Sequence, residues 1–318
     1  MGARTAAIAA LAGGSLAIAS LERTRFRRVR TVVITGASGG IGRASALRLA
    51  RNGFRVFAGY RKEADAAGLV AEATGELEPL RVDVTDPGQV DAAARRVSEA
   101  VAGQGLWGLV NNAGIPIPGP VESLPIDDLR RQLEVNLVGQ IAVTQALLPS
   151  LRQARGRVLN MTSVGGRVAT PFMGAYHASK FGLEAISDSL RRELTPLDVD
   201  VCAIEPGSIA TAIWDRGREQ ADGVISEMSP EAGEVYGAEL GAALRMATRM
   251  GERGLDPDRV ARVVERALTA RRPRPRYVVG ADARAMILAQ RVLPTRAFDR
   301  LLRRGMGLRR RGSRTYTS

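Results

Sequence analysis

The feature that most constrains the fold of this chain is a regular alternation of short apolar runs with longer amphipathic stretches. Apolar runs of strand length recur at residues 31–35, 55–60, 80–84, 106–111, 157–162, 199–204 and 276–280. The stretches between them are long enough for helices that cross from one strand to the next. This order predicts a doubly wound α/β fold, in which a parallel sheet is covered by helices on both faces.

A single domain is expected over residues 30–280, because no internal repeat and no Pro/Gly-rich linker divides that interval. Two helix starts within it are well marked. Asp86-Pro87 and Asp256-Pro257 each place a capping aspartate before a proline at the first helical position. Residues 212–255 lie between the last two expected strands, where a lid over a binding site would sit.

The two ends of the chain differ from this body. Ala6–Leu21 is an uncharged apolar run, and an arginine-rich stretch follows it. Residues 1–29 are interpreted either as an N-terminal membrane anchor, with the body held on the cytoplasmic side by the arginines, or as a loose Ala-rich extension. Residues 281–318 predict a basic amphipathic tail that lies at a lipid surface or packs back onto the domain. Pro294 should divide that tail into two short helices.

Composition excludes several classes of protein. The chain has one cysteine, Cys202, and one histidine, His177, so an internal disulfide framework is excluded and no metal site is expected. The net charge of +13 is concentrated in the two ends, without the aromatic residues that stack on bases. A nucleic-acid partner is therefore not expected.

The first apolar run leads into a glycine-rich turn, TGASGGIGRA. Gly36, Gly40 and Gly42 are its spaced glycines, and Gly39 is an additional one. Glycine lets the chain turn tightly from strand to helix and lets the backbone approach a pyrophosphate, which then meets the free N–H groups of the helix start. The turn predicts a dinucleotide cofactor at the carboxyl ends of the strands, as in Rossmann-like folds.

The end of the second apolar run bears on the choice of cofactor. Many NAD-binding folds carry an acidic residue there, which binds the ribose hydroxyls. Here the sequence is Tyr60-Arg61-Lys62, with no carboxylate to repel a 2′-phosphate and a guanidinium placed to bind one. The pattern favours NADP(H), with NAD(H) as the alternative.

A lysine is placed one helical turn after a tyrosine in a chain that otherwise uses arginine. Of its 46 Lys and Arg residues, only Lys62 and Lys180 are lysine. Tyr176 and Lys180 should project from one helix face. A nearby ammonium group favours the phenolate and lowers the pKa of a phenol from its usual value of about 10, which suits proton transfer.

These motifs resemble those of the short-chain dehydrogenase/reductase family, in its short single-domain branch. The resemblance covers residues 30–280 and rests on TGASGGIG, NNAG at 111–114, Asn136 in EVNLVG, the set Ser163, Tyr176 and Lys180, and PGSIAT at 206–211. The stretches GFRVFAGYR, ARGRVLNMTSVGGR and SKFGLEAISDSLRREL are most similar to the retinol, hydroxysteroid and 3-hydroxybutyrate dehydrogenase subgroup. The resemblance implies an NAD(P)-dependent enzyme that interconverts an alcohol and a ketone or aldehyde, and a homo-oligomer, either dimer or tetramer.

The resemblance also implies roles for individual residues. Tyr176 would transfer the proton, Lys180 would serve the phenol and the ribose, Ser163 would bind the substrate oxygen, and Asn136 would hold a water that relays protons to the lysine. His177 is expected to be structural. The residues implied to bind the cofactor are Gly36, Ser38, Gly39, Gly40, Ile41, Gly42, Tyr60, Arg61, Asp83, Val84, Asn111, Ala113, Gly114, Tyr176, Lys180, Pro206, Gly207, Ile209 and Thr211.

The substrate is less constrained by the sequence. Apolar residues of the lid interval favour a hydrophobic alcohol or ketone of the lipid, retinoid or steroid kind. Arg167, Arg216 and Arg218 could instead bind the carboxylate of a small hydroxy acid. The competing class is a non-catalytic nucleotide-binding protein, against which the intact catalytic set argues.

Overall fold

The computed structural model of the chain describes residues 29–308. The apolar run Ala6–Leu21, and with it the hypothesis of an N-terminal anchor, lies outside these residues. The last part of the basic tail, residues 309–318, lies outside them as well.

A seven-stranded parallel sheet forms the centre of the molecule, in the order β3-β2-β1-β4-β5-β6-β7. Its strands are β1 (Thr31–Ile34), β2 (Arg55–Tyr60), β3 (Leu77–Arg81), β4 (Gly108–Asn111), β5 (Arg157–Met161), β6 (Asp200–Pro206) and β7 (Arg276–Val279). The predicted doubly wound fold is confirmed. The strand order reverses between β1 and β4, and ligands of such sheets bind outside the carboxyl ends of the strands at that reversal.

The third strand begins and ends earlier than the sequence pattern predicted. It pairs with β2 from Val56↔Leu77 to Tyr60↔Arg81. Val82 and Val84, which suggested a strand over 80–84, lie beyond its end and are still buried. The side chain of Asp83 accepts hydrogen bonds from the backbone and the hydroxyl of Thr85, and this local turn ends the strand.

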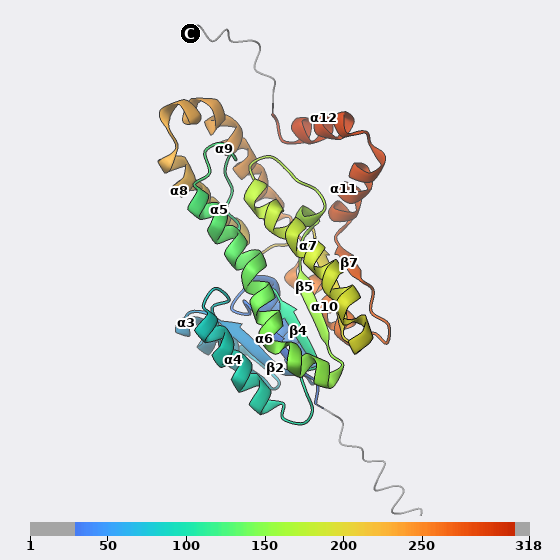
Figure 1. Cartoon of the computed structure of the whole chain (residues 1–318). Coiled ribbons are helices and arrows are strands. Elements are labelled where there is room, and N and C mark those ends of the chain that lie inside the picture. Colours follow the sequence, from blue (N-terminus) through green and yellow to red (C-terminus); the bar gives the residue numbers. More distant parts are fainter. Residues whose placement is uncertain (1–28, 309–318) are drawn as a thin grey trace, which may run out of the picture.

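Helices cover both faces of the sheet (Figure 1). One face carries α2 (Gly40–Arg51), α3 (Glu63–Glu72) and α10 (Pro257–Thr269). The other face carries α4 (Pro87–Ala100), α6 (Gly139–Ala154) and α7 (Gly174–Leu194). A separate apolar cluster fills the space beneath each layer of helices, and together the two clusters bury the sheet on both sides.

Both predicted helix starts are confirmed. Asp86 caps α4 by accepting a hydrogen bond from the backbone N–H of Gln89, and Asp256 caps α10 by accepting one from Asp258. In each helix a proline follows the cap, where its missing N–H costs nothing.

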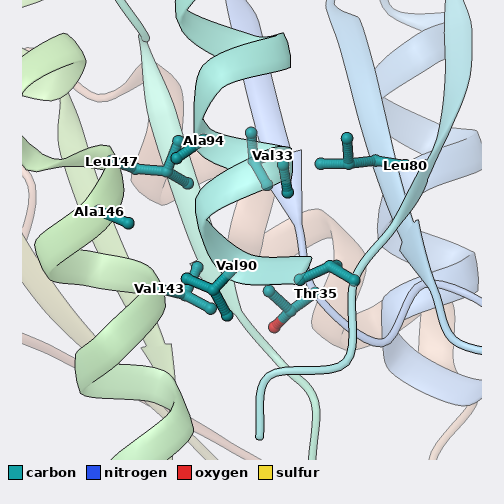
Figure 2. A pocket seen from close by; sticks show the side chains of 10 residues that line it. Val33, Thr35, Leu80, Val90, Ala94, Val143, Ala146 and Leu147 are labelled. Carbon is teal, nitrogen blue, oxygen red and sulfur yellow. The ribbon is translucent and has the colours of Figure 1, made fainter. Parts of the chain in front are cut away.

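A small cavity lies between the sheet and helices α4 and α6 (Figure 2). Its volume is about 10 Å³, and Thr35 is the one lining residue with a polar side chain. The Thr35 hydroxyl already accepts hydrogen bonds from the backbone N–H groups of Asn112 and Ala113. The cavity is therefore a packing void beneath the site and no ligand pocket.

The remaining helices gather at one end of the molecule, the top of the view in Figure 1. They are α5 (Ile126–Leu133), which continues through a π-helical turn (Glu134–Val138) into α6, and α8 (Ile213–Glu227), α9 (Pro230–Glu252), α11 (Ala281–Val292) and α12 (Thr295–Gly305). Pro294 separates α11 from α12, as predicted. Within residues 29–308, none of the helices has both the length and the apolar character needed to cross a bilayer.

Candidate active site

The glycine-rich turn joins β1 to α2 and cannot accept larger residues at Gly36, Gly40 and Gly42. Gly36 and Gly40 have φ angles of +64° and +53°, in the left-handed region that favours glycine. A Cβ added to Gly42 would lie 2.2 Å from the carbonyl oxygen of Gly36, and one added to Gly36 would lie 2.8 Å from the Cα of Ala113. The turn is therefore folded tightly on itself and against the segment that follows β4.

Two residues absent from the sequence-based list hold this turn in place. Thr35 binds the backbone of Asn112 and Ala113 through its hydroxyl, at 2.9 and 3.0 Å. The side-chain amide of Asn112 donates to the carbonyl oxygens of Thr35 and Gly36, each at 3.0 Å. Thr35 and Asn112 each come directly after a strand, and these two strands pair in the sheet. The sequence shows that each residue follows a strand, but it does not show which strands are neighbours.

The loop after β6 crosses the turn. The side chain of Thr211 lies 3.1 Å from where a Cβ on Gly40 would be, and a guanidinium nitrogen of Arg216, on α8, lies 3.6 Å from the same position on Gly39. Asp282, at the start of α11, accepts a hydrogen bond from the backbone N–H of Ser208 at 2.8 Å. Of the predicted residues in this loop, Thr211 is thus brought to the turn, together with Arg216, while Gly207 lies against Asp282.

Three other residues predicted to bind the cofactor have side chains that contact other parts of the protein. Asn111 is 1% exposed, and its amide donates to Thr144 and Asn160, so the side chain faces the core between β4, β5 and α6. Val84 packs against Gly139 of α6. The carboxylate of Asp83 is occupied by Thr85. Of the predicted residues that follow β4, Ala113 lies against Gly36 and Gly114 lies beside Asn136.

Glu63, the first residue of α3, brings a carboxylate next to the end of β2. The hydroxyl of Tyr60 donates to Glu63, at 3.1 Å from one carboxylate oxygen. Arg81 lies 3.7 Å from the same side chain. Arg61 makes no ion pair with another side chain of residues 29–308. A cation and an anion therefore both lie near the end of β2, where the sequence places the ribose of the cofactor.

Ser163, Tyr176 and Lys180 come together at the carboxyl end of β5. The hydroxyl of Ser163 lies close enough to the hydroxyl of Tyr176 to act on the pKa of the phenol. Lys180 follows Tyr176 by one turn of α7, and its ammonium nitrogen lies 5.8 Å from the centre of the Tyr176 ring. The ammonium group also donates to the carbonyl oxygen of Met161 at 2.8 Å. Tyr176 and Lys180, the two residues expected on one helix face, both lie on α7 one turn apart.

Burial dominates the ionisation of this pair. It raises the pKa of Tyr176 above its ordinary value, and the hydrogen bond with Ser163 opposes that effect. The direction is opposite to the one expected from the spacing of Tyr176 and Lys180, because burial, which removes the phenolate from water, is the largest cause. Burial also lowers the pKa of Lys180 to about 8, although the charge of Glu184 acts against it. The lysine therefore loses its charge before the tyrosine does.

Asn136 lies in the π-helical turn between α5 and α6 and is fully buried. Its side chain binds both backbone groups of Ile115, accepting from the N–H at 2.8 Å and donating to the carbonyl at 2.9 Å. It also approaches the hydroxyl of Ser179, on the catalytic helix, at 3.2 Å. Asn136 thus connects the segment after β4 to the helix that carries Tyr176 and Lys180.

An ionic network around two buried carboxylates lies behind the segments that carry Ser163 and Lys180. Glu205, at the end of β6, is fully buried and lies 3.2 Å from both Arg167 and Arg276. Arg276 also binds Glu184 of α7 at 3.0 Å. Burial raises the pKa of Glu205, and the charge of Glu184 adds to that effect. Arg167 is therefore engaged within the protein, and Arg218 is paired with Asp215.

The chain is similar to known proteins over most of its length. Residues 30–222 match the short chain dehydrogenase family. Retinol dehydrogenase 5 of Mus musculus is 43% identical over 279 residues, which cover 85% of this chain and 87% of that protein. Retinol dehydrogenase 16 of Homo sapiens is 42% identical over 280 residues, which cover 86% and 88%.

Solved structures show the same fold. A short chain dehydrogenase/reductase from Burkholderia phymatum in complex with NAD has a TM-score of 0.71 at 26% identity, covering 83% of this chain and 93% of that chain. A short chain dehydrogenase from Burkholderia cenocepacia in complex with NADP has a TM-score of 0.65 at 25% identity, covering 86% and 98%.

The chain belongs to the short-chain dehydrogenase/reductase family, close to the retinol dehydrogenase subgroup, as the sequence resemblance implied. It is an NAD(P)-dependent oxidoreductase that acts on CH–OH groups.

The lowered pKa of Lys180 generates a prediction about pH. We expect kcat/KM for carbonyl reduction to fall as the pH rises through about 8, because Lys180 loses its proton there while Tyr176 keeps its own. Lys180→Arg keeps a charge at that position, so any activity that it retains should lack this decline. A steady-state pH profile of both proteins measures the effect, and a flat wild-type profile through this region would contradict the assignment.

Proposed function

We propose that this chain interconverts a lipophilic alcohol and its carbonyl compound, with Tyr176 as the group that gives and takes the proton. The placement of the Ser163 hydroxyl beside that of Tyr176, with the Lys180 ammonium beside the ring, carries the proposal. A carbonyl oxygen placed at these two hydroxyls would be held by Ser163 and protonated by Tyr176 during reduction. A phenol with a raised pKa stays protonated at neutral pH, so it is present as the donor that reduction requires.

The residues of the turn fit a dinucleotide cofactor, which supplies or accepts the hydride when bound. A Cβ at Gly39 would meet only the Arg216 guanidinium, at 3.6 Å, so the backbone there is open on the side that Arg216 faces. The free N–H groups at the start of α2 and the Arg216 guanidinium would both attract a pyrophosphate. The other residues expected to line the cofactor are the spaced glycines of the turn with Ser38 and Ile41, and Ala113, Pro206, Gly207, Ile209 and Thr211.

Lys180 and Asn136 would complete the path of the proton. The Lys180 ammonium lies close enough to Tyr176 to stabilise the phenolate that remains after the proton leaves. Asn136 fixes the backbone at Ile115 beside the catalytic helix, and we propose that it holds the water that returns a proton through Lys180.

A retinoid-like or other lipid alcohol is the substrate class that we propose. Two relatives at 42–43% identity are named retinol dehydrogenases. Two of the three arginines that could bind a small hydroxy acid are already paired, Arg167 with Glu205 and Arg218 with Asp215. A small hydroxy acid therefore remains the second candidate, dependent on Arg216 alone.

Tyr176→Phe tests the proposed chemistry. We expect kcat to fall by roughly 10²–10⁴-fold, because the variant loses its general acid while the ring still packs in place. Turnover with retinoid-like alcohols and aldehydes, medium-chain ketones and short 3-hydroxy acids would be followed through the absorbance of the reduced cofactor, and cofactor affinity would be measured by titration.

Tyr277→Phe is the matched control, because its hydroxyl binds only the backbone of Arg274, on β7 and away from the site. Near-normal kcat in Tyr176→Phe would overturn the assignment, and a preference for short hydroxy acids would overturn the substrate class.

For the cofactor we propose a preference for NADP(H) over NAD(H), supported by Arg61, which makes no ion pair within the described chain. Glu63, held against Tyr60, acts in the opposite direction by repelling a 2′-phosphate. We expect the guanidinium to dominate. Arg61→Ala should then weaken NADPH by roughly tenfold or more and leave NADH little changed, as for one charge-assisted hydrogen bond.

A second pair of variants, measured in the same titrations, separates binding of the 2′-phosphate from binding of the pyrophosphate. Arg216→Ala should weaken NADPH and NADH alike, because both carry the pyrophosphate. Arg218→Ala is its control, since that arginine lies on the same helix and is paired with Asp215. Tighter binding of NADH than NADPH by the wild type would contradict the proposed preference.

We also propose that the chain associates with a membrane through α11 and α12, with the catalytic domain on the cytoplasmic side. Leu288, Val292 and Leu301 are 62%, 68% and 49% exposed on these two helices. Six arginines and two aspartates accompany them over residues 281–305, which suits an anionic lipid surface. A lipophilic substrate would then be collected where it dissolves.

Sedimentation with vesicles tests this surface. Wild-type protein should pellet with vesicles that contain phosphatidylserine, and Leu288→Asp with Val292→Asp should reduce the bound fraction several-fold because two exposed apolar contacts are lost. Val70→Asp, at a residue 45% exposed on α3, is the control. Equal binding by all variants would exclude the α11–α12 surface as the membrane contact. Release of all of them by salt alone would indicate that the arginines, and not the apolar side chains, bind the vesicles.

The homo-oligomer implied by the family resemblance remains a proposal. Val138 and Phe181 are 46% and 42% exposed, one in the π-helical turn before α6 and the other on α7, and a second subunit covering them would account for their exposure. The mass of the protein in solution would test this directly.

A further inference from the structure

The one histidine of the chain occupies a defined site beside the catalytic tyrosine. His177 follows Tyr176 on α7 and is 7% exposed. Its Nδ1 lies 2.9 Å from the carbonyl oxygen of Gly165, and its Nε2 lies 2.9 Å from the hydroxyl oxygen of Thr170. Both ring nitrogens are therefore engaged, and both partners lie in the segment between Ser163 and α7.

The partners determine which nitrogen carries the proton. A carbonyl oxygen can only accept, so Nδ1 donates to Gly165. In the neutral ring Nε2 is then an acceptor, and the Thr170 hydroxyl donates to it. Burial lowers the pKa of His177, while the hydrogen bond to Gly165 opposes that effect. The neutral ring with its proton on Nδ1 is thus the form that satisfies both partners.

Gly165 connects this ring to the catalytic hydroxyls. Its backbone N–H donates to the Ser163 hydroxyl oxygen at 3.0 Å. That bond uses one acceptor position of the oxygen and restricts where the Ser163 hydrogen and remaining lone pair can point. The hydroxyl of Tyr176 lies close to the same oxygen. A continuous path runs from the imidazole through Gly165 to Ser163 and then to Tyr176.

The packing at Gly165 leaves little room for adjustment. A Cβ added there would lie 2.7 Å from Nδ1 of His177 and 3.2 Å from a ring carbon of Tyr176. The two rings themselves meet edge to face, with centres 5.8 Å apart. Moving the imidazole therefore moves Gly165, and with it the donor that orients Ser163.

We propose that His177 is a positioning residue for the reaction: through the hydrogen bond to Gly165 it sets the Ser163 hydroxyl in line with Tyr176. This inference rests on the proposed roles of Ser163 and Tyr176. It differs from a packing role because it assigns the effect to one ring nitrogen, Nδ1, and to one partner.

Three substitutions at this position separate the two nitrogens. His177→Asn can place an amide N–H where Nδ1 is, so it keeps the bond to Gly165 and loses the one to Thr170. His177→Gln places its amide one carbon further out, near Thr170. His177→Phe keeps a flat ring without either bond. We expect kcat to fall roughly 10–100-fold in the Phe and Gln variants, as for a small misplacement of a reacting group, and to recover in the Asn variant.

The affinity for the cofactor should stay near the wild-type value in all three variants, because the ring does not touch the glycine-rich turn. Thermal unfolding of each variant is measured alongside kcat. If kcat follows the melting temperature, and the Asn variant recovers neither, His177 only stabilises the helix and the inference is wrong. His177→Asn and His177→Gln keep the test valid even where His177→Phe does not fold.

A double-mutant cycle with Ser163→Ala tests the path itself. If His177 acts through Ser163, His177→Gln should lower kcat little further once the Ser163 hydroxyl is gone. Losses that multiply in the double variant would overturn the path.

Tyr176→Phe and Ser163→Ala alone report on the underlying roles. Full activity in those two variants would overturn the proposed function, whereas their inactivity beside normal His177 variants would overturn only this inference.

Discussion

The hydroxyl of Thr35 is the contact on which the site depends. It accepts two backbone N–H groups from the segment after β4 and so joins the end of β1 to the end of its neighbour. Strand order reverses at this boundary, so the chain departs in opposite directions and leaves a crevice between the two strand ends. The glycine-rich turn, closed by Asn112, forms one wall of that crevice. The segment after β4 forms the other wall. The buried amide of Asn136 binds this segment at Ile115 and extends the connection to Ser179 on α7.

Burial shapes the chemistry as much as charge does. The same exclusion of water that keeps Tyr176 protonated lowers the pKa of Lys180, so the two groups are poised at different points of the pH scale. Behind them, Glu205 and Glu184 share Arg276, which lets two carboxylates remain in the interior. Removing one member of such a network leaves another charge unpaired, which usually costs more than the network contributes. The Ser163 segment is therefore held from behind through Arg167 and from the side through His177.

The spacing of apolar residues and the helix-capping residues in the sequence predicted most of the fold. Apolar runs and Asp-Pro caps located the strands and helix starts, because both depend on interactions that are local or nearly so. The boundary of β3 was missed, since Val82 and Val84 are buried by residues distant in the sequence. Thr35, Asn112 and Asp282 were missed for the same reason, as each acts on a segment brought close only by strand order. The direction of the Tyr176 pKa required knowledge of burial, which spacing along a helix does not provide.

The hydrogen bond from Ser208 to Asp282 couples two parts of the protein that otherwise share little. Asp282 belongs to the first turn of α11, and a Cβ on Gly207 would lie 2.5 Å from its carboxylate oxygens. α11 and the loop after β6 should therefore become ordered together. If the loop closes on a nucleotide, as proposed, whatever immobilises α11 would lower the entropy lost on closure, and the nucleotide would return the same free energy to α11. The C-terminal helices would thus contribute to nucleotide binding, although they lie beyond residues 30–222, where the family match ends.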